Sequence, residues 1–358
     1  MSKLFKLSLD PQTVKQWKRF RSIKRGYYSA VILVFLLCLS FFAELFINSR
    51  ALIVSYEGKW FFPTYGKVIP GTTFGLDYDS KTNYKELKKL FKEQKEGNWV
   101  LMPLVPYDPF ETHDAPVDDV LYTYGAEPPS WETQHYLGTD TLGRDILARI
   151  AYGFRIAMSF SLVLLVCSYV AGIAVGCAMG YWGGAFDLLF QRLIEIWNTI
   201  PFLYVIMIVS VVVSANFWTL VFVMVIFGWT AMTWNMRTST YKEKSREYVN
   251  AARALGASNV RVIGVHILPN TISVIVTFIP FSIAGGIAAL TALDYLGFGL
   301  QPPTPSWGEL LRSGMQRLDH WWIVTSVAVA IIIVLLMVTF IGEAIREAFD
   351  PKKFTYYE

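Results

Sequence analysis

The chain has 358 residues, of which 54% are hydrophobic and 17% are charged. A soluble domain carries about 25% charged residues, so this composition and a mean hydropathy of +0.39 exclude an ordinary soluble protein and indicate an integral membrane protein with a water-exposed part. The net charge of +4 says little about function as a total, because in a membrane protein the distribution of basic residues among the loops indicates the orientation. We expect no nucleic acid as a partner.

The sequence carries no pattern that is typical of a catalytic or metal site. Its three cysteines lie inside apolar segments, and its four histidines are scattered without the spacing of metal ligands. It also lacks a phosphate-binding glycine-rich loop and a nucleophile elbow. We therefore expect that this chain is not an enzyme, has no catalytic residue, and binds no metal or other cofactor itself.

The first part of the chain is basic and then apolar. Residues 1–26 contain eight Lys/Arg and one acidic residue, with Trp17 and Phe20 on the apolar face of a predicted helix. This pattern predicts a cytoplasmic amphipathic segment on the anionic membrane lipid of the inner leaflet. Residues 27–47 are long enough to form the first transmembrane helix, and the long basic region before them indicates an anchor that is retained.

Residues 48–155 are polar and contain no predicted span. They carry 12 Lys/Arg and 15 Asp/Glu. Residues 56–73 are rich in aromatic side chains and turn formers, which favours short strands, whereas the Lys- and Glu-rich residues 84–97 favour an amphipathic helix. The sequence therefore predicts a mixed α/β insertion between the first and second transmembrane helices.

Five further apolar segments predict a five-helix membrane core within residues 156–343. Their approximate ranges are 156–181, 192–213, 217–236, 270–293 and 321–341. Small residues at Gly172, Gly176 and Gly180, and again at 284–286, favour close contact between helices. The predicted fold is thus an all-α integral membrane protein with six transmembrane helices.

The orientation follows from the basic residues of the short loops. The loop 237–268 contains six Lys/Arg and the tail 344–358 contains three, whereas the loop 295–320 contains two. Because cytoplasmic loops are enriched in Lys and Arg, both termini and the 237–268 loop are predicted to be cytoplasmic. The 48–155 insertion then lies on the periplasmic side.

The polar residues 245–270 predict a hairpin of two short helices. One helix is predicted over 245–255, and Gly256 is the natural left-handed residue just past its end. Ser258 then caps a second short helix, which Pro269 is expected to stop. Small side chains, an excess of positive charge and little apolar surface indicate a segment that inserts into a partner.

The spacing within this hairpin resembles the EAA loop of ABC-importer permeases. That loop reads Glu-Ala-Ala, three residues, Gly, nine residues and Ile-x-Leu-Pro. The matching positions here are Ala251, Ala252, Gly256, Leu268 and Pro269. The sequence departs from the pattern at Asn250, which replaces the glutamate, and at His266, which replaces the isoleucine.

Three other segments resemble the oligopeptide/dipeptide (OppC/DppC-like) branch of this family. Residues 137–145 (LGTDTLGRD), preceded by Pro-Tyr-Asp-Pro at 106–109, resemble its GTDxxGRD signature. Residues 295–308 resemble the segment between its last two spans, and residues 342–351 resemble its C-terminal ending. In the first of these, paired charges are predicted to fix the start of the second span. The predicted structural residues are Asp140, Gly143, Arg144 and Asp145.

The YEGKWFFP segment at 56–63 resembles the microcin C-type peptide importers most. The resemblance to the family implies the type I ABC-importer permease fold in the bacterial inner (plasma) membrane. It implies a second permease subunit in a heterodimer, cytoplasmic ATPase subunits that bind ATP and Mg, a periplasmic substrate-binding protein and a peptide substrate. In that family the hairpin is the coupling helix that sits in a groove of the ATPase. The predicted ATPase-coupling residues are Glu247, Ala251, Ala252, Arg253, Gly256, Leu268 and Pro269.

Two other classes of function remain alternatives. An ion-driven secondary transporter is expected to contain an inverted repeat and paired acids near the bilayer midplane, and neither is visible in the sequence. A membrane-anchored peptide receptor would use the outer region for binding, but one or two spans would suffice for it.

Asp294 is a candidate for the substrate pathway. It lies at the predicted outer end of the fifth span, where a carboxylate near hydrocarbon needs a partner or water. A negative charge is also unfavourable at the C-terminus of a helix, so we expect a compensating group, with Arg312 and Arg317 nearest in sequence. Alternatively, Asp294 is exposed to water at the membrane interface.

Overall fold

The structure is a computed structural model of the chain. It describes residues 11–95, 97–112, 125–213 and 215–349. Residues 1–10 of the predicted basic segment, 113–124 of the predicted insertion and 350–358 of the predicted tail lie outside the described residues. The chain divides into two compact units: unit 1 comprises 1–34, 158–289 and 333–358, and unit 2 comprises 35–157 and 290–332.

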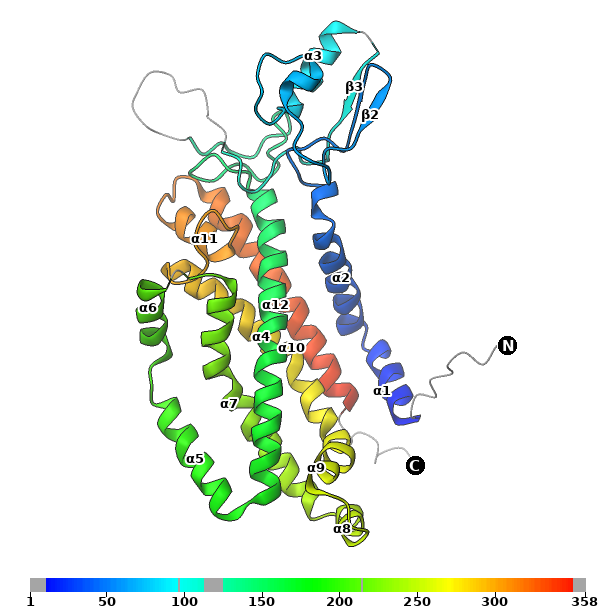
Figure 1. The fold of residues 1–358 in the computed structure, drawn as a ribbon, viewed down its shortest axis with the longest axis vertical. Helices are drawn as coiled ribbons and strands as arrows, with labels where there is room; N and C mark the ends of the chain where they lie inside the picture. Colours follow the sequence, from blue (N-terminus) through cyan, green and yellow to red (C-terminus); the bar gives the residue numbers. More distant parts are fainter. Residues whose placement is uncertain (1–10, 96, 113–124, 214, 350–358) are drawn as a thin grey trace, which may run out of the picture. The chain divides into compact units, whose positions relative to one another are not determined.

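Five helices of the described chain are long and apolar enough to cross a membrane. They are α2 (Lys24–Phe41), α4 (Ile146–Trp182), α7 (Phe217–Lys244), the continuous helix Asn259–Leu296 that ends in α10 (Leu268–Leu296), and α12 (Trp321–Phe349). Figure 1 traces these helices through the sequence colours, with α4 drawn as one long green helix. Five of the six predicted spans are therefore confirmed as helices of sufficient length.

The remaining predicted span, 192–213, is wrong as a single helix. Two helices cover this region, α5 (Gly184–Asn198) and α6 (Phe202–Val212), and they meet at a bend of 67°. Pro201 lies at the break and lacks the backbone N–H that a continuing helix would need. The pair makes a sixth span only as a broken one.

The predicted α/β insertion is present in unit 2. After the 3-10 turn η1 (Ala43–Leu45), strand β1 (Ile53–Tyr56) pairs antiparallel with β2 (Lys59–Phe61) and with β3 (Trp99–Leu101), in the order β2-β1-β3. Strand β3 was not predicted, because three residues are too few to show an alternating pattern.

Helix α3 (Tyr84–Gln94) confirms the predicted amphipathic helix of the insertion. The side chain of Asn83 caps its start by accepting the backbone N–H groups of Lys85 and Glu86. On its inner face Leu87 and Phe91 are buried in a core that the sheet and the 3-10 turn η2 (Gly71–Phe74) complete. Helix α3 therefore packs on the sheet, as Figure 1 shows, and is not solvated on all sides.

In unit 1, α4 packs closely against α7. A Cβ atom at Gly172, Gly176 or Gly180 would lie between 2.5 and 2.7 Å from backbone oxygens of α7, so the predicted close contact is confirmed. In the second group of small residues, 284–286, only one of the two glycines lies close to another helix. A Cβ at Gly286 would lie 3.0 Å from the Ser161 hydroxyl, whereas a Cβ at Gly285 would meet nothing within 4 Å.

The first and last described helices also pack together within unit 1. Helix α1 (Pro11–Ser22) places Phe20 in a buried cluster with Ala344 and Ala348 of α12. Trp17, predicted on the same apolar face, is 57% exposed. The amphipathic face of α1 is therefore partly covered by α12.

Candidate functional site

The predicted hairpin follows α7 and belongs to unit 1. It contains α8 (Glu247–Ala254), the short α9 (Asn259–Arg261) and a π-helical turn, η3 (Val262–Ile267). Gly256 has a φ of +80°, which confirms the predicted left-handed residue after the first helix. The Ser258 side chain accepts the backbone N–H of Arg261, which confirms the predicted cap.

The predicted role of Pro269 as a stop is wrong. The helix that begins at Asn259 continues through η3 into α10, and Pro269 is the second residue of α10. Pro269 follows directly on the π-helical turn, where the hydrogen-bond pattern of the helix changes and a residue without a backbone N–H is accommodated. The π-helical turn before it shifts the hydrogen-bond pattern locally, so the hairpin joins the membrane span without a break.

The interior of the hairpin is built around Tyr181, near the end of α4. Its side chain is 2% exposed and packs with Val249, Val262 and Ile267. The Tyr181 hydroxyl donates to the Asn259 side chain at 2.8 Å and accepts the Nε–H of Arg253 at 3.2 Å. The guanidinium carbon of Arg253 lies 4.6 Å from the centre of the Tyr181 ring. Tyr181 therefore holds both hairpin helices to α4, a role that sequence reasoning missed.

The predicted coupling residues differ in exposure. Ala252 is buried and Leu268 is half-buried, whereas the exposed ones are Glu247, Ala251, Arg253, Gly256 and Pro269. Two residues that were not predicted, Leu255 and Val260, are 88% and 82% exposed and flank the turn at Gly256. Aliphatic residues on either side of a predicted turn, in an otherwise polar hairpin, are the sequence signal that could have identified this apolar tip.

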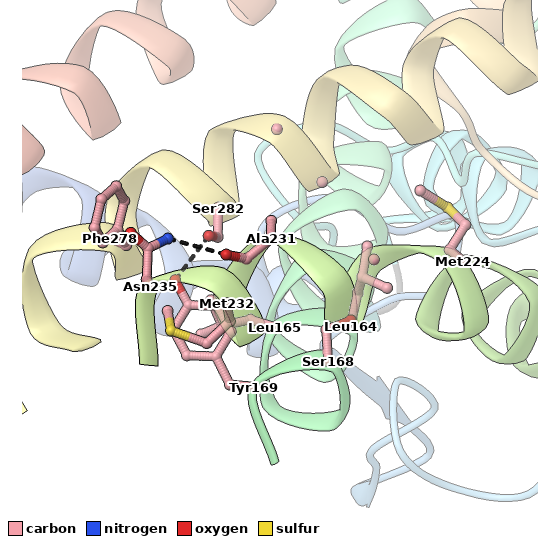
Figure 2. Close-up of a pocket in the computed structure, with 13 residues that line it drawn as sticks. Leu164, Leu165, Ser168, Tyr169, Met224, Ala231, Met232, Asn235, Phe278 and Ser282 are labelled. Carbon is pink, nitrogen blue, oxygen red and sulfur yellow. Dashed lines mark hydrogen bonds between the residues drawn. The ribbon is translucent and has the colours of Figure 1, made fainter. Parts of the chain in front are cut away.

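A cavity of about 250 Å³ lies in unit 1 between α4, α7 and α10. Figure 2 shows its lining side chains, of which none is charged. Tyr169 and Ser282 form a hydroxyl–hydroxyl hydrogen bond of 2.8 Å, and the Asn235 amide nitrogen donates to the Ala231 carbonyl at 3.0 Å. The Ser168 hydroxyl is buried and has no hydrogen-bond partner. Sequence reasoning did not identify this cavity.

The predicted structural motif lies in unit 2 at the start of α4. Asp140, Arg144 and Asp145 are all buried, and Gly143 has a φ of +73° in the turn between them. The Nε–H of Arg144 donates to Asp140 at 2.7 Å. Asp145 accepts the backbone N–H of Ala148 at 2.7 Å and so caps α4. The predicted charge pairing at the start of the second span is confirmed.

Glu309 of α11 (Trp307–Met315) completes this cluster and was missed. Its carboxylate bonds the Arg144 guanidinium at 2.8 Å and pairs with Arg149, whose side chain is fully buried. Arg149 also donates to the Pro109 carbonyl at 3.0 Å, which brings the Pro-Tyr-Asp-Pro segment to the same place. Arg144 and Arg149 therefore bring the segments 106–109 and 137–145 together in unit 2 with Glu309, the residue that follows the 295–308 segment.

Beside this cluster, the aromatic ring of Tyr107 organises part of the insertion. The Lys85 ammonium lies 3.4 Å from the ring centre, and the His135 ring stacks on Tyr107 with centroids 3.8 Å apart. His135 Nδ1 lies 2.8 Å from Asp145. Burial lowers the pKa of Lys85 to about 8 and raises the pKa of Tyr107 to about 12.

Asp294 is buried near the end of α10 in unit 2. Its carboxylate accepts the backbone N–H of Leu300 at 2.7 Å and the hydroxyl of Ser306, which caps α11. The expectation that Arg312 or Arg317 compensates the charge is wrong, because loop donors that follow the helix supply the bonds. The interfacial alternative is also wrong, since only 6% of Asp294 is exposed. Its substrate-pathway role stays a prediction, and the geometry supports a structural role.

Within the residues that the structure describes, no group of three or more His, Cys, Asp or Glu side chains is arranged to hold a metal ion. The arrangements that remain are a surface hairpin with an apolar tip, an uncharged cavity among membrane helices, and a charged cluster that orders the loops around α11.

Comparisons with known proteins give the family. Residues 172–355 match the family model described as binding-protein-dependent transport system inner membrane component. The chain is 39% identical to the inner membrane ABC transporter permease protein YejE of Escherichia coli strain K12, over 96% of this chain and 98% of that one. It is 35% identical to the peptidoglycan transport system permease protein YejE of Agrobacterium fabrum, over 96% and 94% of the two chains.

A third relative covers less of the chain. The dipeptide transport system permease protein DppC of Bacillus subtilis is 31% identical over 63% of this chain and 70% of its own length. The hairpin, the apolar helices and these matches agree on a multi-pass inner-membrane protein. The chain belongs to the binding-protein-dependent transport system inner membrane components, as a permease subunit of an ABC transporter.

Proposed function

We propose that this chain forms half of the translocation pore of an ABC importer for peptides. The observation that carries the proposal is a match over 96% of the chain, the insertion included, to two permeases named YejE. One of these is named for peptidoglycan transport and DppC is named for dipeptide transport, and amide-linked amino acids are common to both substrates. Short peptides are therefore the proposed substrate, with peptidoglycan-derived and microcin C-like peptides as specific candidates.

The proposal includes partners that complete the transporter. A second, similar permease forms the other half of the pore in a heterodimer, and a periplasmic substrate-binding protein delivers the peptide. Cytoplasmic ATPase subunits bind ATP and Mg and perform the hydrolysis, so this chain performs none. Both chain termini and the hairpin lie in the cytoplasm, as the six Lys/Arg of residues 237–268 support.

The hairpin is the proposed contact with the ATPase. Its tip presents Leu255 and Val260 to the outside, and exposed aliphatic side chains gain free energy when a partner buries them. Its other face is fixed to α4 through Tyr181, whose ring and hydroxyl contact both hairpin helices. Movement of the ATPase would therefore pass to α4 and, through the unbroken helix 259–296, to α10.

Substitution of Leu255 tests this contact. Leu255→Ser is expected to weaken binding of the ATPase subunits by about tenfold or more, because burial of a leucine side chain contributes about 1.5–3 kcal/mol. The measurement is the amount of ATPase that copurifies with the tagged chain in mild detergent. Leu318→Ser, at a leucine that is 67% exposed in unit 2, is the matched control and should copurify normally. Equal copurification of both variants would contradict the proposed contact.

The turn at Gly256 gives a second prediction, which depends on backbone conformation alone. A Cβ here meets nothing within 4 Å, but the φ of +80° costs an L residue about 1–2 kcal/mol. Gly256→Val is expected to lower substrate-stimulated ATP hydrolysis of the assembled complex, since the second hairpin helix is misaligned. Gly256→Asn should retain most of it, because asparagine tolerates the left-handed region. Normal stimulation in Gly256→Val would show that the turn geometry is not needed.

The substrate is tested by deletion of the gene for this chain. Mass spectrometry of the growth medium should find short peptides that wild-type cells remove and deleted cells leave behind. Depletion of ATP should have the same effect, whereas an ion-driven transporter would lose uptake when the ion gradient is collapsed at constant ATP. Uptake that follows the gradient would favour the secondary-transporter alternative over the ABC importer.

A further inference from the structure

Helix α3 of the insertion forms one wall of an open pocket of about 670 Å³ in unit 2. The other walls come from residues 102–107, which follow β3, and from residues 132–136. This volume lies within the range of about 300–1,000 Å³ that is typical of ligand pockets. The pocket is distinct from the cavity among the membrane helices, and it lies in the part of the chain that is predicted to face the periplasm.

One lysine of this wall has its charge largely compensated within the insertion. The Lys85 ammonium lies 3.4 Å from the centre of the Tyr107 ring. Three acidic side chains also act on it electrostatically: Glu111, Asp145 and Asp108. Lys85 therefore holds α3 against the Tyr107 segment, and its charge is not the one that is left for a partner.

Two further lysines of α3 make the rim of the pocket positively charged. Lys88 and Lys89 are exposed, and within the described part of the chain neither is paired with an acidic side chain. Among the lining residues that the structure describes, Glu132 is the only acidic one. The open side of the pocket therefore favours an anionic group.

Apolar side chains lie in and beside the same pocket. Leu104 of the lining is 69% exposed. Trp131 is 84% exposed, and its ring packs edge-on against Tyr136 of the lining, with centroids 4.9 Å apart. Burial of large apolar side chains favours association, and tryptophan is common among the residues that dominate protein–protein interfaces.

These features fit a segment of a protein better than a small molecule or a lipid. Small-ligand sites enclose most of the surface of the ligand, whereas Lys88, Lys89 and Leu104 are exposed. Lipid headgroups lie at the ends of membrane spans, but within unit 2 helix α3 lies on the side of the insertion away from the end of α2, as Figure 1 shows. An apolar anchor with a polar rim is the usual composition of a protein–protein interface.

We propose that this pocket docks an acidic segment of the periplasmic substrate-binding protein, with Lys88 and Lys89 as the charged contacts and Leu104 as the apolar anchor. The proposal rests on the proposed function, in which a soluble protein delivers the peptide, and it assigns the insertion a part in that delivery. Opposite charges speed the encounter and fix its orientation, and burial of Leu104 slows dissociation.

Reversal of the two lysine charges tests the site. The measurement is the Kd of the purified, peptide-loaded substrate-binding protein for the complete transporter in lipid nanodiscs. In the double variant Lys88→Glu with Lys89→Glu, the Kd should rise by about tenfold or more at low salt. The difference from wild type should shrink at high salt, because exposed charges are then screened.

The matched control is the double variant Lys59→Glu with Lys67→Glu. Both lysines are exposed residues of the insertion outside the lining, and this double variant has the same net charge as the first one. Its Kd should stay within about twofold of wild type, because only the long-range field of the insertion changes.

Leu104→Ser provides an independent measurement. The Kd should rise by about tenfold at low and at high salt alike, because salt does not screen the burial of an apolar side chain. Leu104 is exposed in the free chain, so the melting temperature should not fall. An unchanged Kd would overturn the assignment of Leu104 as the anchor.

Photo-cross-linking identifies the occupant directly. The photoreactive residue p-benzoylphenylalanine is introduced at Lys88, and the cross-linked peptides are identified by mass spectrometry in the presence of the substrate-binding protein. A cross-link to a segment of that protein that contains Asp or Glu supports the docking site. A cross-link only to the second permease, to lipid or to this chain itself would overturn it.

The outcomes separate the docking site from the transport function. If wild type and both double variants bind the substrate-binding protein equally well, the site is overturned and the import function stands. If both double variants lose affinity equally, only the net charge of the insertion matters, and the site is again overturned. If the wild-type transporter neither binds the substrate-binding protein nor imports peptide with it, the proposed function fails together with the site.

Discussion

Glu309→Gln is expected to lower the stability of the chain by about 3–5 kcal/mol, because it leaves two buried arginines with one carboxylate between them. The Glu309 carboxylate pairs with both Arg144 and Arg149. Arg149 is fully buried, and without Glu309 its nearest negative charge is Asp140, at 3.6 Å from Nε and not hydrogen-bonded to it. Removal of one partner from a buried pair is costly because the remaining charge has lost its hydration.

The measurement is thermal unfolding of the purified chain in a background in which the exposed Cys38 and Cys167 are replaced by serine, followed by the fluorescence of a thiol dye that reacts with the buried Cys177 on unfolding. Glu195→Gln is the matched control, because Glu195 pairs with Arg192 in an exposed i,i+3 pair whose loss should change stability by less than about 1 kcal/mol. In the double variant Glu309→Gln with Arg149→Met, much of the loss should be recovered, since no unpaired buried charge remains. If the losses of stability from the two substitutions simply add in the double variant, Glu309 and Arg149 do not interact energetically.

Local patterns allowed much of the fold to be predicted. Apolar length predicted the membrane helices, and the position of Gly256 after a helical run predicted its positive φ, because both depend on residues close in sequence. The amphipathic pattern of residues 84–97 likewise predicted α3, although not the core that its inner face joins. In these cases the residues that form the feature are also the residues that signal it.

Contacts between residues far apart in the sequence could not be predicted from such local patterns. Glu309 reaches Arg144 and Arg149 from 165 and 160 residues away, so only the folded loops of unit 2 bring them together. The Ser306–Glu309 spacing does signal a helix start, because a serine cap is often followed three residues later by glutamate. It gives no information on the partner of that glutamate.

The errors at proline have one physical origin. Pro201 was placed inside a continuous span and Pro269 was placed at the end of a helix, yet Pro201 marks a bend and Pro269 lies inside a continuous helix, just after its π-helical turn. A proline removes one N–H and fixes φ, and whether this ends a helix depends on whether that N–H had an acceptor. At Pro269 the neighbouring π-helical turn lets the helix continue, and no sequence pattern predicted that turn.

Gly176→Val is expected to prevent stable packing of α4 on α7. A Cβ at Gly176 would lie 2.5 Å from the Thr233 carbonyl oxygen and 2.8 Å from the Met236 Cβ. The first of these atoms is backbone in the middle of a helix, so it cannot move aside without displacing α7 as a whole. Overpacking typically costs about 1–3 kcal/mol, and a contact with backbone is at the upper end of that range.

The effect should increase with the size of the new side chain. Gly176→Ala already creates the short contact, and Gly176→Val adds two methyl groups to it, so the yield of monodisperse protein in gel filtration should fall from wild type to alanine to valine. Gly285→Ala, in the neighbouring helix α10, adds a Cβ that meets nothing within 4 Å and should elute as wild type does. The same contrast separates packing from helix propensity, because both substitutions replace glycine by a better helix former. Wild-type yields for all variants would mean that α4 and α7 do not approach as closely as the three glycines indicate.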